Sequence, residues 1–317
     1  MPFILFIVLI GSAITINKYL IKISRVTIDR NDLNIKENII ENETNTLQNN
    51  EIATSQNNDI QNIALFGIDE TEGTAGRSDC IIIFTIDNKH NKLKLSSIIR
   101  DSYVFIPTKE KKDKINHAYA FGGPQLALKT LNENFNLNLD RFVTVNFSSL
   151  PKIIDDIGGI TLDVTNDELG YLNHYIYDLN NLNGTNSPYV TTSGFQKIDG
   201  TQALAYCRIR YTEGGDFERS QRHRTVISEL IKKCKTIPIN QYTFVLNELF
   251  PLVQTNLETS EILSLIIDLN PLRNQSILQD RFPRDEVGKG ELIDGIYYYV
   301  FDEALTTKNI HNFIYDE

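Results

Sequence analysis

The sequence predicts an α/β fold in which helices cover a central sheet. From Asn62 onward, short apolar or alternating runs rich in β-branched and aromatic residues alternate with segments of helical periodicity. An uncharged apolar N-terminus and a polar stretch without aromatic residues precede this pattern. Strands that alternate with helices are typical of a layered α/β domain. We therefore expect one such domain over residues 62–317, preceded by an anchor and a linker.

The N-terminus predicts a membrane anchor. Residues 2–16 carry no charge, and apolar character continues through Ile21. A spanning helix needs about 20 mostly apolar residues, a length reached here if Lys18 extends its charge to the interface. We assign residues 1–24 to a single transmembrane helix, with a cleaved signal peptide or a buried core helix as alternatives. By the positive-inside rule alone, the basic residues after this segment would place the following chain in the cytoplasm.

Residues 25–61 are expected to form a disordered linker. Most of the stretch is polar and Asn-rich, with no sustained hydrophobic period. A flexible coil of this length reaches on the order of 30 Å, which would lift a domain off a membrane surface.

Within the domain, strands are predicted from runs of β-branched and aromatic residues. The expected strands are 62–68, 80–86, 92–98, 141–147, 276–282 and 295–301. Helical spacing predicts the helices 117–135, 148–157, 199–206, 216–235, 241–254, 259–269 and 302–314. Gly158 and Gly159 end the second of these helices, and Asp302 caps the last. The polar residues 170–197 are expected to form a loop at the rim.

The composition restricts the class of partner. The formal net charge is -10, which argues against a general nucleic-acid binder because such proteins need basic surface. The three cysteines lie in apolar runs without metal-ligand spacing, and we read them as small buried hydrophobic residues.

An arginine-rich segment, residues 206–224, stands out in this acidic chain because it holds five of the 13 arginines. If residues 206–211 are extended, Arg208 and Arg210 share one face. In the helix that follows, Arg219, Arg222 and His223 share a stripe with apolar residues, so this stripe opens onto a polar pocket. Planar guanidinium groups suit phosphate oxygens. A solvated face of salt bridges is the equal alternative at this point.

A Gly-rich segment, residues 67–80, brings two carboxylates close to an arginine. Asp69 follows a strand, and Arg77 and Asp79 precede the next. Two carboxylates near a phosphate-binding arginine are what Mg²⁺-assisted phosphoryl transfer requires, although a turn with acidic capping residues is the common reading. Arg100 with Asp101 is a third candidate, or a local ion pair.

A fourth candidate lies in KINHAYAFGG, residues 114–123. Lys114 could contact phosphate, whereas His117 is read as a helix-start residue rather than a catalyst.

These motifs together resemble one family. The chain carries, in order, GIDETEGTAGRSD, IIRD, KINHAYAFGG, DRFVTVNFSSLPKIIDDIGGITLDV, IDGTQALAYCRIRY and GDFERSQRHRTVI. Over about residues 62–235 this closely resembles the LytR-CpsA-Psr family of bacterial cell-envelope proteins. The resemblance implies a three-layer α/β/α sandwich around a mixed central sheet, with a membrane anchor and a catalytic domain outside the cell membrane. It also implies a Mg²⁺-dependent transferase that moves a teichoic acid or capsule-type polymer from a polyprenyl diphosphate lipid to peptidoglycan.

The resemblance also implies roles for individual residues. Asp79 matches the metal-binding acid and Asp69 the other catalytic-site acid. The diphosphate-binding cations match Arg77, Arg100, Lys114, Arg208, Arg210, Arg219 and Arg222. We assign Asp69, Asp79 and Arg100 to catalysis, with the two carboxylates as metal ligands.

Three features depart from the family pattern. Ile99 stands where the family usually has Pro, which loosens the turn before Arg100. His223 stands where the family often has Gln; it can still donate to phosphate, but its charge would vary with pH. The N-terminus lacks the usual cytoplasmic basic residues.

The expected function is therefore phosphotransfer by a single-pass protein of the cell membrane, with its catalytic domain extracellular. A lipid diphosphatase that uses water as acceptor, and a non-catalytic envelope regulator that binds polyprenyl diphosphate, are the alternatives.

Overall fold

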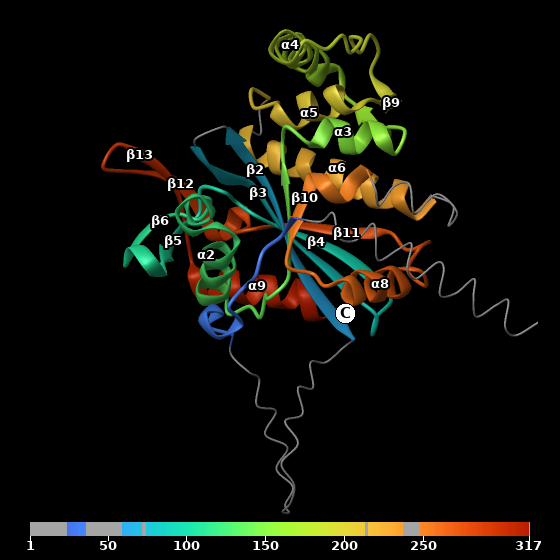
Figure 1. Cartoon of the computed structure of the whole chain (residues 1–317). Helices are drawn as coiled ribbons and strands as arrows, with labels where there is room; N and C mark the ends of the chain where they lie inside the picture. The colour runs from blue at the N-terminus through green and yellow to red at the C-terminus, as the bar shows by residue number, and fades with distance from the viewer. Residues whose placement is uncertain (1–23, 36–58, 72–73, 213–214, 237–247, 317) are drawn as a thin grey trace, which may run out of the picture.

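The fold is built on a mixed seven-stranded sheet (Figure 1). The computed structural model describes residues 24–35, 59–71, 74–212, 215–236 and 248–316. The strand order is β1-β10-β7-β2-β3-β4-β11. Their bounds are β1 (Ser24–Arg25), β2 (Ile60–Thr71), β3 (Thr74–Asp87), β4 (Lys92–Ile98), β7 (Phe142–Asn146), β10 (Val253–Thr255) and β11 (Ile277–Phe282). β2, β3 and β4 pair antiparallel, whereas β7 and β11 lie parallel to β2 and β4.

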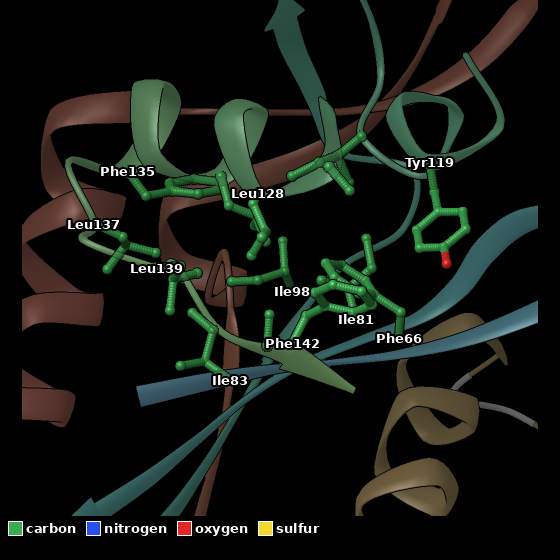
Figure 2. Close-up of a cluster of buried hydrophobic side chains, with 14 of the residues drawn as sticks. Phe66, Ile81, Ile83, Ile98, Tyr119, Leu128, Phe135, Leu137, Leu139 and Phe142 are labelled. Atoms are coloured by element: carbon green, nitrogen blue, oxygen red, sulfur yellow. The ribbon is translucent and has the colours of Figure 1, made fainter. Parts of the chain in front are cut away.

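One face of the sheet is covered by α2 (His117–Phe135) and α9 (Glu303–Tyr315). Figure 2 shows the core on this side, where Phe66, Ile81 and Ile83 of the sheet pack against Leu128 and Phe135 of α2. Alternate residues of β3 enter this core because successive side chains of a strand point to opposite faces. Asp302 caps α9 by accepting a hydrogen bond from the Leu305 amide, as predicted.

The opposite face is covered by α3 (Leu150–Asp156), α5 (Gly200–Arg208), α6 (Gly215–Thr236) and α8 (Thr259–Leu269). Ile82 and Phe84 of β3 pack here with Leu265 of α8, and Val226 of α6 is buried in the adjoining cluster. Helices therefore lie on both sides of the sheet, which confirms the three-layer α/β/α sandwich (Figure 1).

Three two-stranded antiparallel sheets extend the layers. They are β5 (Tyr103–Ile106) with β6 (Lys111–Lys114), β8 (Ile160–Val164) with β9 (Gly194–Ile198), and β12 (Gly288–Ile293) with β13 (Ile296–Phe301). Short 3-10 helices are η1 (Arg30–Leu33), η2 (Pro107–Lys109), η4 (Phe250–Leu252) and η5 (Asp285–Val287).

The expectation of a loop over residues 170–197 is wrong. Half of it lies in α4 (Asn166–Asn183), which begins with a capping box of Thr165 and Glu168, and residues 194–197 lie in β9. The apolar stripe Leu172, Ile176 and Leu179 is buried, but many Asn and Tyr residues between these positions obscure it in the sequence.

Two further expectations are corrected. Residues 206–208 are not extended, because α5 continues to Arg208 before the chain leaves the helix at Ile209. The helix expected over 241–254 falls partly on residues 237–247, outside the described residues. Residues 250–254 lie in η4 and in the strand β10, which pairs with β1 and β7.

The N-terminal assignments fall partly outside the described residues. Residues 1–23 and 36–58 are not described, and none of the helices that the structure describes is long and apolar enough to cross a membrane. Residues 25–35, assigned to a disordered linker, are folded, and Ser24, assigned to the anchor, lies in β1. β1 pairs parallel with β10, and Leu33 of η1 is fully buried, because apolar side chains in this stretch find a place in the α2 core.

Candidate functional site

Asp79 owes its position to a β-bulge in β3. Gly67 of β2 lies opposite Cys80 and Ile68 lies opposite Ser78, so Asp79 is the extra residue on β3. Bulges redirect side chains and are common beside functional sites. A Cβ on Gly67 would come within 2.8 Å of the Cys80 Cβ and 3.0 Å of the Phe147 ring, so the close pairing at this bulge requires glycine.

Three guanidinium groups converge on the Asp79 carboxylate. Its Oδ2 lies 2.8 Å from Arg100 Nη1, 3.0 Å from Arg219 Nη2 and 3.8 Å from Arg210 Nη2. Its Oδ1 accepts a hydrogen bond of 3.1 Å from Asn116 Nδ2. Burial raises the pKa of Asp79, but the charges of Arg100 and Arg219 and the hydrogen bonds outweigh burial and lower this pKa to about 2. Asp79 is therefore an anion at neutral pH.

Asp79 lines a pocket of about 240 Å³ between the sheet, α4, α5 and α6. The pocket is lined by Asp69, Asp79, Phe147, Tyr175, Leu204, Cys207, Arg208, Arg210, Arg219 and His223. Cations from the end of α5 and from α6 form its polar part, and Phe147, Leu204 and Cys207 form an apolar part. Such a mixed wall suits an anion that carries an apolar group. Every charged residue of this lining, and His223, was a candidate from the sequence. Tyr175 and the apolar residues of the lining were not predicted.

Arg100 and Lys114 do not line the pocket. Arg100 bridges Asp79 and Asp101, whose Oδ2 lies 3.3 Å from the Arg100 Nε. Lys114 Nζ lies 2.6 Å from the other oxygen of Asp101. Ile99 does not loosen the turn, because the Ser102 amide donates to the Ile99 carbonyl at 3.1 Å and closes it. Arg100 therefore holds Asp79 directly, and Lys114 supports this contact through Asp101.

Asn116 was missed by sequence reasoning. It lies between Lys114 and His117, within KINHAYAFGG, and donates to Asp79. In the sequence, the one signal for Asn116 was its place inside KINHAYAFGG, a motif that carries the family resemblance.

Asp69 and Arg77 lie opposite each other on β2 and β3. Both side chains are exposed, and Asp69 lines the pocket whereas Arg77 does not. The predicted pair of carboxylates is therefore brought to one pocket, whereas Arg77 is not part of its lining.

Arg222 points away from the pocket. Its Nε donates to Glu168 Oε1 at 2.8 Å, and its Nη2 donates to Glu218 at 2.9 Å and to the Thr212 hydroxyl at 2.9 Å. Its Nη1 donates to the Ile209 carbonyl at 3.2 Å. Arg222 shares the predicted stripe of α6, but it joins α6 to α4 and to the end of α5.

His223 is buried and neutral. Its Nε2 lies 3.1 Å from the Cys207 carbonyl, which can only accept, so Nε2 carries the proton and Nδ1 is an acceptor. Burial, followed by the charge of Arg219, lowers the pKa of His223 to about 3. The expected change of charge near neutral pH is therefore wrong, because a cation at this buried position would face Arg219. In this tautomer His223 presents an acceptor, not a donor, to a ligand.

The donor set fits a magnesium ion. Mg²⁺ usually takes one or two carboxylates and completes its shell with water and phosphate oxygens. Asp69 and Asp79 supply two hard oxygen donors in one pocket. Within the described part of the chain no group of three or more His, Cys, Asp or Glu residues could hold a metal. The remaining ligands would have to come from water or from a bound anion.

Known proteins are similar to this chain over most of its length. A model of the LytR_cpsA_psr family matches residues 24–313. The polyisoprenyl-teichoic acid–peptidoglycan teichoic acid transferase TagU of Bacillus cereus is 35% identical over 246 residues, which cover 76% of this chain and 74% of TagU. TagU of Enterococcus faecalis is 31% identical over 251 residues, covering 78% of this chain and 76% of that protein.

Solved structures share the fold. TagT bound to LIIa-WTA superimposes with a TM-score of 0.64 at 26% identity, covering 81% of this chain and 91% of that one. TagT with a bound octaprenyl pyrophosphate lipid gives a TM-score of 0.60 at 26% identity, covering 81% and 90%. The family match spans most of the sequence, and the curated relatives exceed 30% identity over three quarters of it. The chain therefore belongs to the LytR-CpsA-Psr family.

Proposed function

We propose that this protein transfers a teichoic acid or capsule-type glycopolymer phosphate from a polyprenyl diphosphate carrier to peptidoglycan. The observation that carries the proposal is the convergence of Arg100, Arg210 and Arg219 on one carboxylate at a pocket with an apolar wall. Relatives named as teichoic acid transferases, and TagT structures that hold a polyprenyl pyrophosphate lipid or LIIa-WTA, support the same substrate class.

The pocket cations bind the diphosphate. Arg208, Arg210 and Arg219 offer planar donors to its oxygens, and each charge-assisted hydrogen bond contributes roughly 1.5–3 kcal/mol. Phe147, Leu204 and Cys207 give the first isoprene units an apolar surface. Arg100 and Lys114 act indirectly, because they hold Asp101 and Asp79 rather than the ligand.

The transfer step is an in-line displacement. A sugar hydroxyl of peptidoglycan forms a bond to the glycan-proximal phosphorus, the bond from this phosphorus to the bridging oxygen breaks, and polyprenyl phosphate leaves. Guanidinium groups stabilise the charge that develops on the phosphoryl oxygens. Asp79 is already held by three guanidinium groups, which leaves Asp69 on the exposed side of the pocket to accept the hydroxyl proton.

Magnesium is part of the proposal. Asp79 and Asp69 would hold Mg²⁺, which when bound would neutralise diphosphate charge. The residues 1–24 would anchor the protein in the cell membrane by a single transmembrane helix, with the catalytic domain extracellular, where peptidoglycan is accessible.

A transfer assay tests the proposal. The full chain in detergent is incubated with a disaccharide-linked polyprenyl diphosphate and a peptidoglycan oligomer, with Mg²⁺ or with EDTA. We expect glycan phosphate on the oligomer, and a loss of at least about a hundredfold in Arg219→Gln. Arg273→Gln is the control, because Arg273 is exposed and lies outside the pocket.

Three results would contradict the proposal. Release of glycan phosphate without attachment would indicate a diphosphatase. Binding of the lipid without turnover would indicate a regulator. Equal transfer in Mg²⁺ and in EDTA would contradict only the proposed role of Mg²⁺ and would leave the transfer itself supported.

A further inference from the structure

Three tyrosines lead outward from the candidate site. Tyr175 of α4 lines the pocket. Tyr171 precedes it by four residues, so both lie on the same face of α4. Tyr211 follows α5, and its ring centroid lies 6.3 Å from that of Tyr171, with the ring planes inclined by 38°. Tyr171 is 37% exposed and Tyr211 is 71% exposed. The aromatic faces therefore begin at the pocket and continue to its mouth.

The inner end of this row lies among the pocket cations. Burial raises the pKa of Tyr175, and the neighbouring Tyr211 raises it further, whereas Arg210, Arg219 and Arg208 oppose this shift. The Tyr175 phenol is thus close enough to feel both Tyr211 and the three arginines. A group bonded to an anion in the pocket would meet Tyr175 first and then Tyr211.

The helix that carries Tyr171 and Tyr175 is held in a fixed position. Glu168, on the first turn of α4, is paired with Arg222 of α6 in a buried contact of 2.8 Å. The apolar stripe of α4 packs into the core formed with α5, so the helix is fixed over the pocket. Aromatic residues on a fixed helix lose little entropy when a ligand packs against them.

We propose that Tyr171, Tyr175 and Tyr211 form a glycan subsite that binds the sugar bonded to the substrate's diphosphate. This subsite rests on the proposed function, because that function places a diphosphate in the pocket. Pyranose rings present C–H faces that pack on aromatic rings and hydroxyls that pair with phenols, so amphipathic tyrosines suit them. An isoprenoid chain would instead need an enclosed apolar surface, which exposed phenols do not provide.

The occupant is the donor sugar rather than the acceptor. The donor sugar is separated from the diphosphate by a single glycosyl–phosphate linkage. Its ring must therefore lie within about one sugar width of the pocket arginines, where Tyr175 is found. Binding energy gained on this non-reacting ring can also position the phosphorus for attack.

The test compares two ligands and two kinds of variant. Binding of polyprenyl diphosphate and of its disaccharide-linked form is measured on the full chain in detergent, for wild type, Tyr171→Ala and Tyr211→Ala. Tyr177→Ala is the matched control, because Tyr177 is a 55% exposed tyrosine of α4 that does not share the face of Tyr171 and Tyr175. We expect each subsite variant to bind the disaccharide-linked form about tenfold more weakly, with bare polyprenyl diphosphate and Tyr177→Ala unchanged. Tyr211→Phe, which keeps the ring, should retain most of the affinity.

Each other outcome has a definite meaning. Equal losses for both ligands, or the same loss in Tyr177→Ala, would overturn the subsite while leaving the diphosphate site intact. If the subsite variants bind the disaccharide-linked lipid with unchanged affinity but show a raised KM for peptidoglycan in the transfer assay, the assignment to the donor sugar is overturned. If wild type binds neither ligand, the proposed function fails, and the subsite fails with it.

Discussion

Arg222 and Glu168 lie 54 positions apart in the chain and form a buried ion pair of 2.8 Å that joins α6 to α4. The side chains are 4% and 9% exposed. The Glu168 carboxylate also accepts a hydrogen bond from the Thr165 amide at the start of α4. The Arg222 guanidinium lies 5.9 Å from the Tyr206 ring centroid. The pair is part of a structural network that sets the position of one pocket wall.

Removal of Arg222 should therefore destabilise the protein. Arg222→Gln leaves Glu168 buried without its charged partner, and a loss of about 3 kcal/mol or more is expected in denaturant unfolding. Arg273→Gln, an exposed control, should stay within about 0.5 kcal/mol of wild type. The double variant Arg222→Gln/Glu168→Gln should lose less than the sum of the single losses, because the pair is coupled. Wild-type stability with lost lipid binding would instead support Arg222 as a diphosphate ligand.

This pair shows what the sequence could and could not predict. The spacing of Arg219, Arg222 and His223 placed them on one buried stripe of α6, which is confirmed because helical geometry is local. That Arg219 reaches Asp79 while Arg222 reaches Glu168 depends on the tertiary position of α4. α4 was expected to be a loop, since its three apolar anchors are separated by polar residues. Likewise, the bulge that turns Asp79 into the pocket is a matter of strand register, which residues 67–80 do not reveal by themselves.

Asp79 should compete with phosphate for the pocket cations. Asp79→Asn removes the charge on which Arg100, Arg210 and Arg219 converge, so these groups become available to an anion. We expect the variant to bind inorganic diphosphate about tenfold more tightly in EDTA, measured calorimetrically, because one competing negative charge is lost. Transfer should fall by at least about a hundredfold, because the carboxylate that organises these groups is gone. Weaker binding of diphosphate in EDTA would show that Asp79 is not a competitor.

His223 should make the fold sensitive to acid but leave catalysis insensitive near neutrality. Folding lowers the pKa of this imidazole from 6.5 to about 3, so the unfolded chain takes up a proton in this interval that the folded chain does not. Stability should therefore fall as the pH drops from 6.5 toward 3. His223→Gln should weaken this dependence in thermal unfolding across that range. A wild-type activity profile with a step between about pH 6 and pH 8 that disappears in His223→Gln would show that His223 titrates during turnover.

Arg224 should oppose stability. Its side chain is buried beside Arg281, and within the described part of the chain its Nε and Nη1 have no hydrogen-bond partner. Burial, and then the charge of Arg281, lower the pKa of Arg224 to about 10, which means that folding disfavours the charged form. Methionine has a similar length and no charge to desolvate, so Arg224→Met should raise stability by about 1 kcal/mol or more.

Thermal unfolding measures this effect, because a gain of about 1 kcal/mol corresponds to roughly 2–4 °C in a domain of this size. Arg281→Met is the matched comparison and should lower the Tm. Arg281 contacts Asp285 at 2.7 Å and lies 3.9 Å from the Phe217 ring centroid, so its charge has direct partners. The charge of Asp280 offsets only part of the cost of burying Arg224. A lower Tm for Arg224→Met would mean that the guanidinium has a stabilising partner in solution.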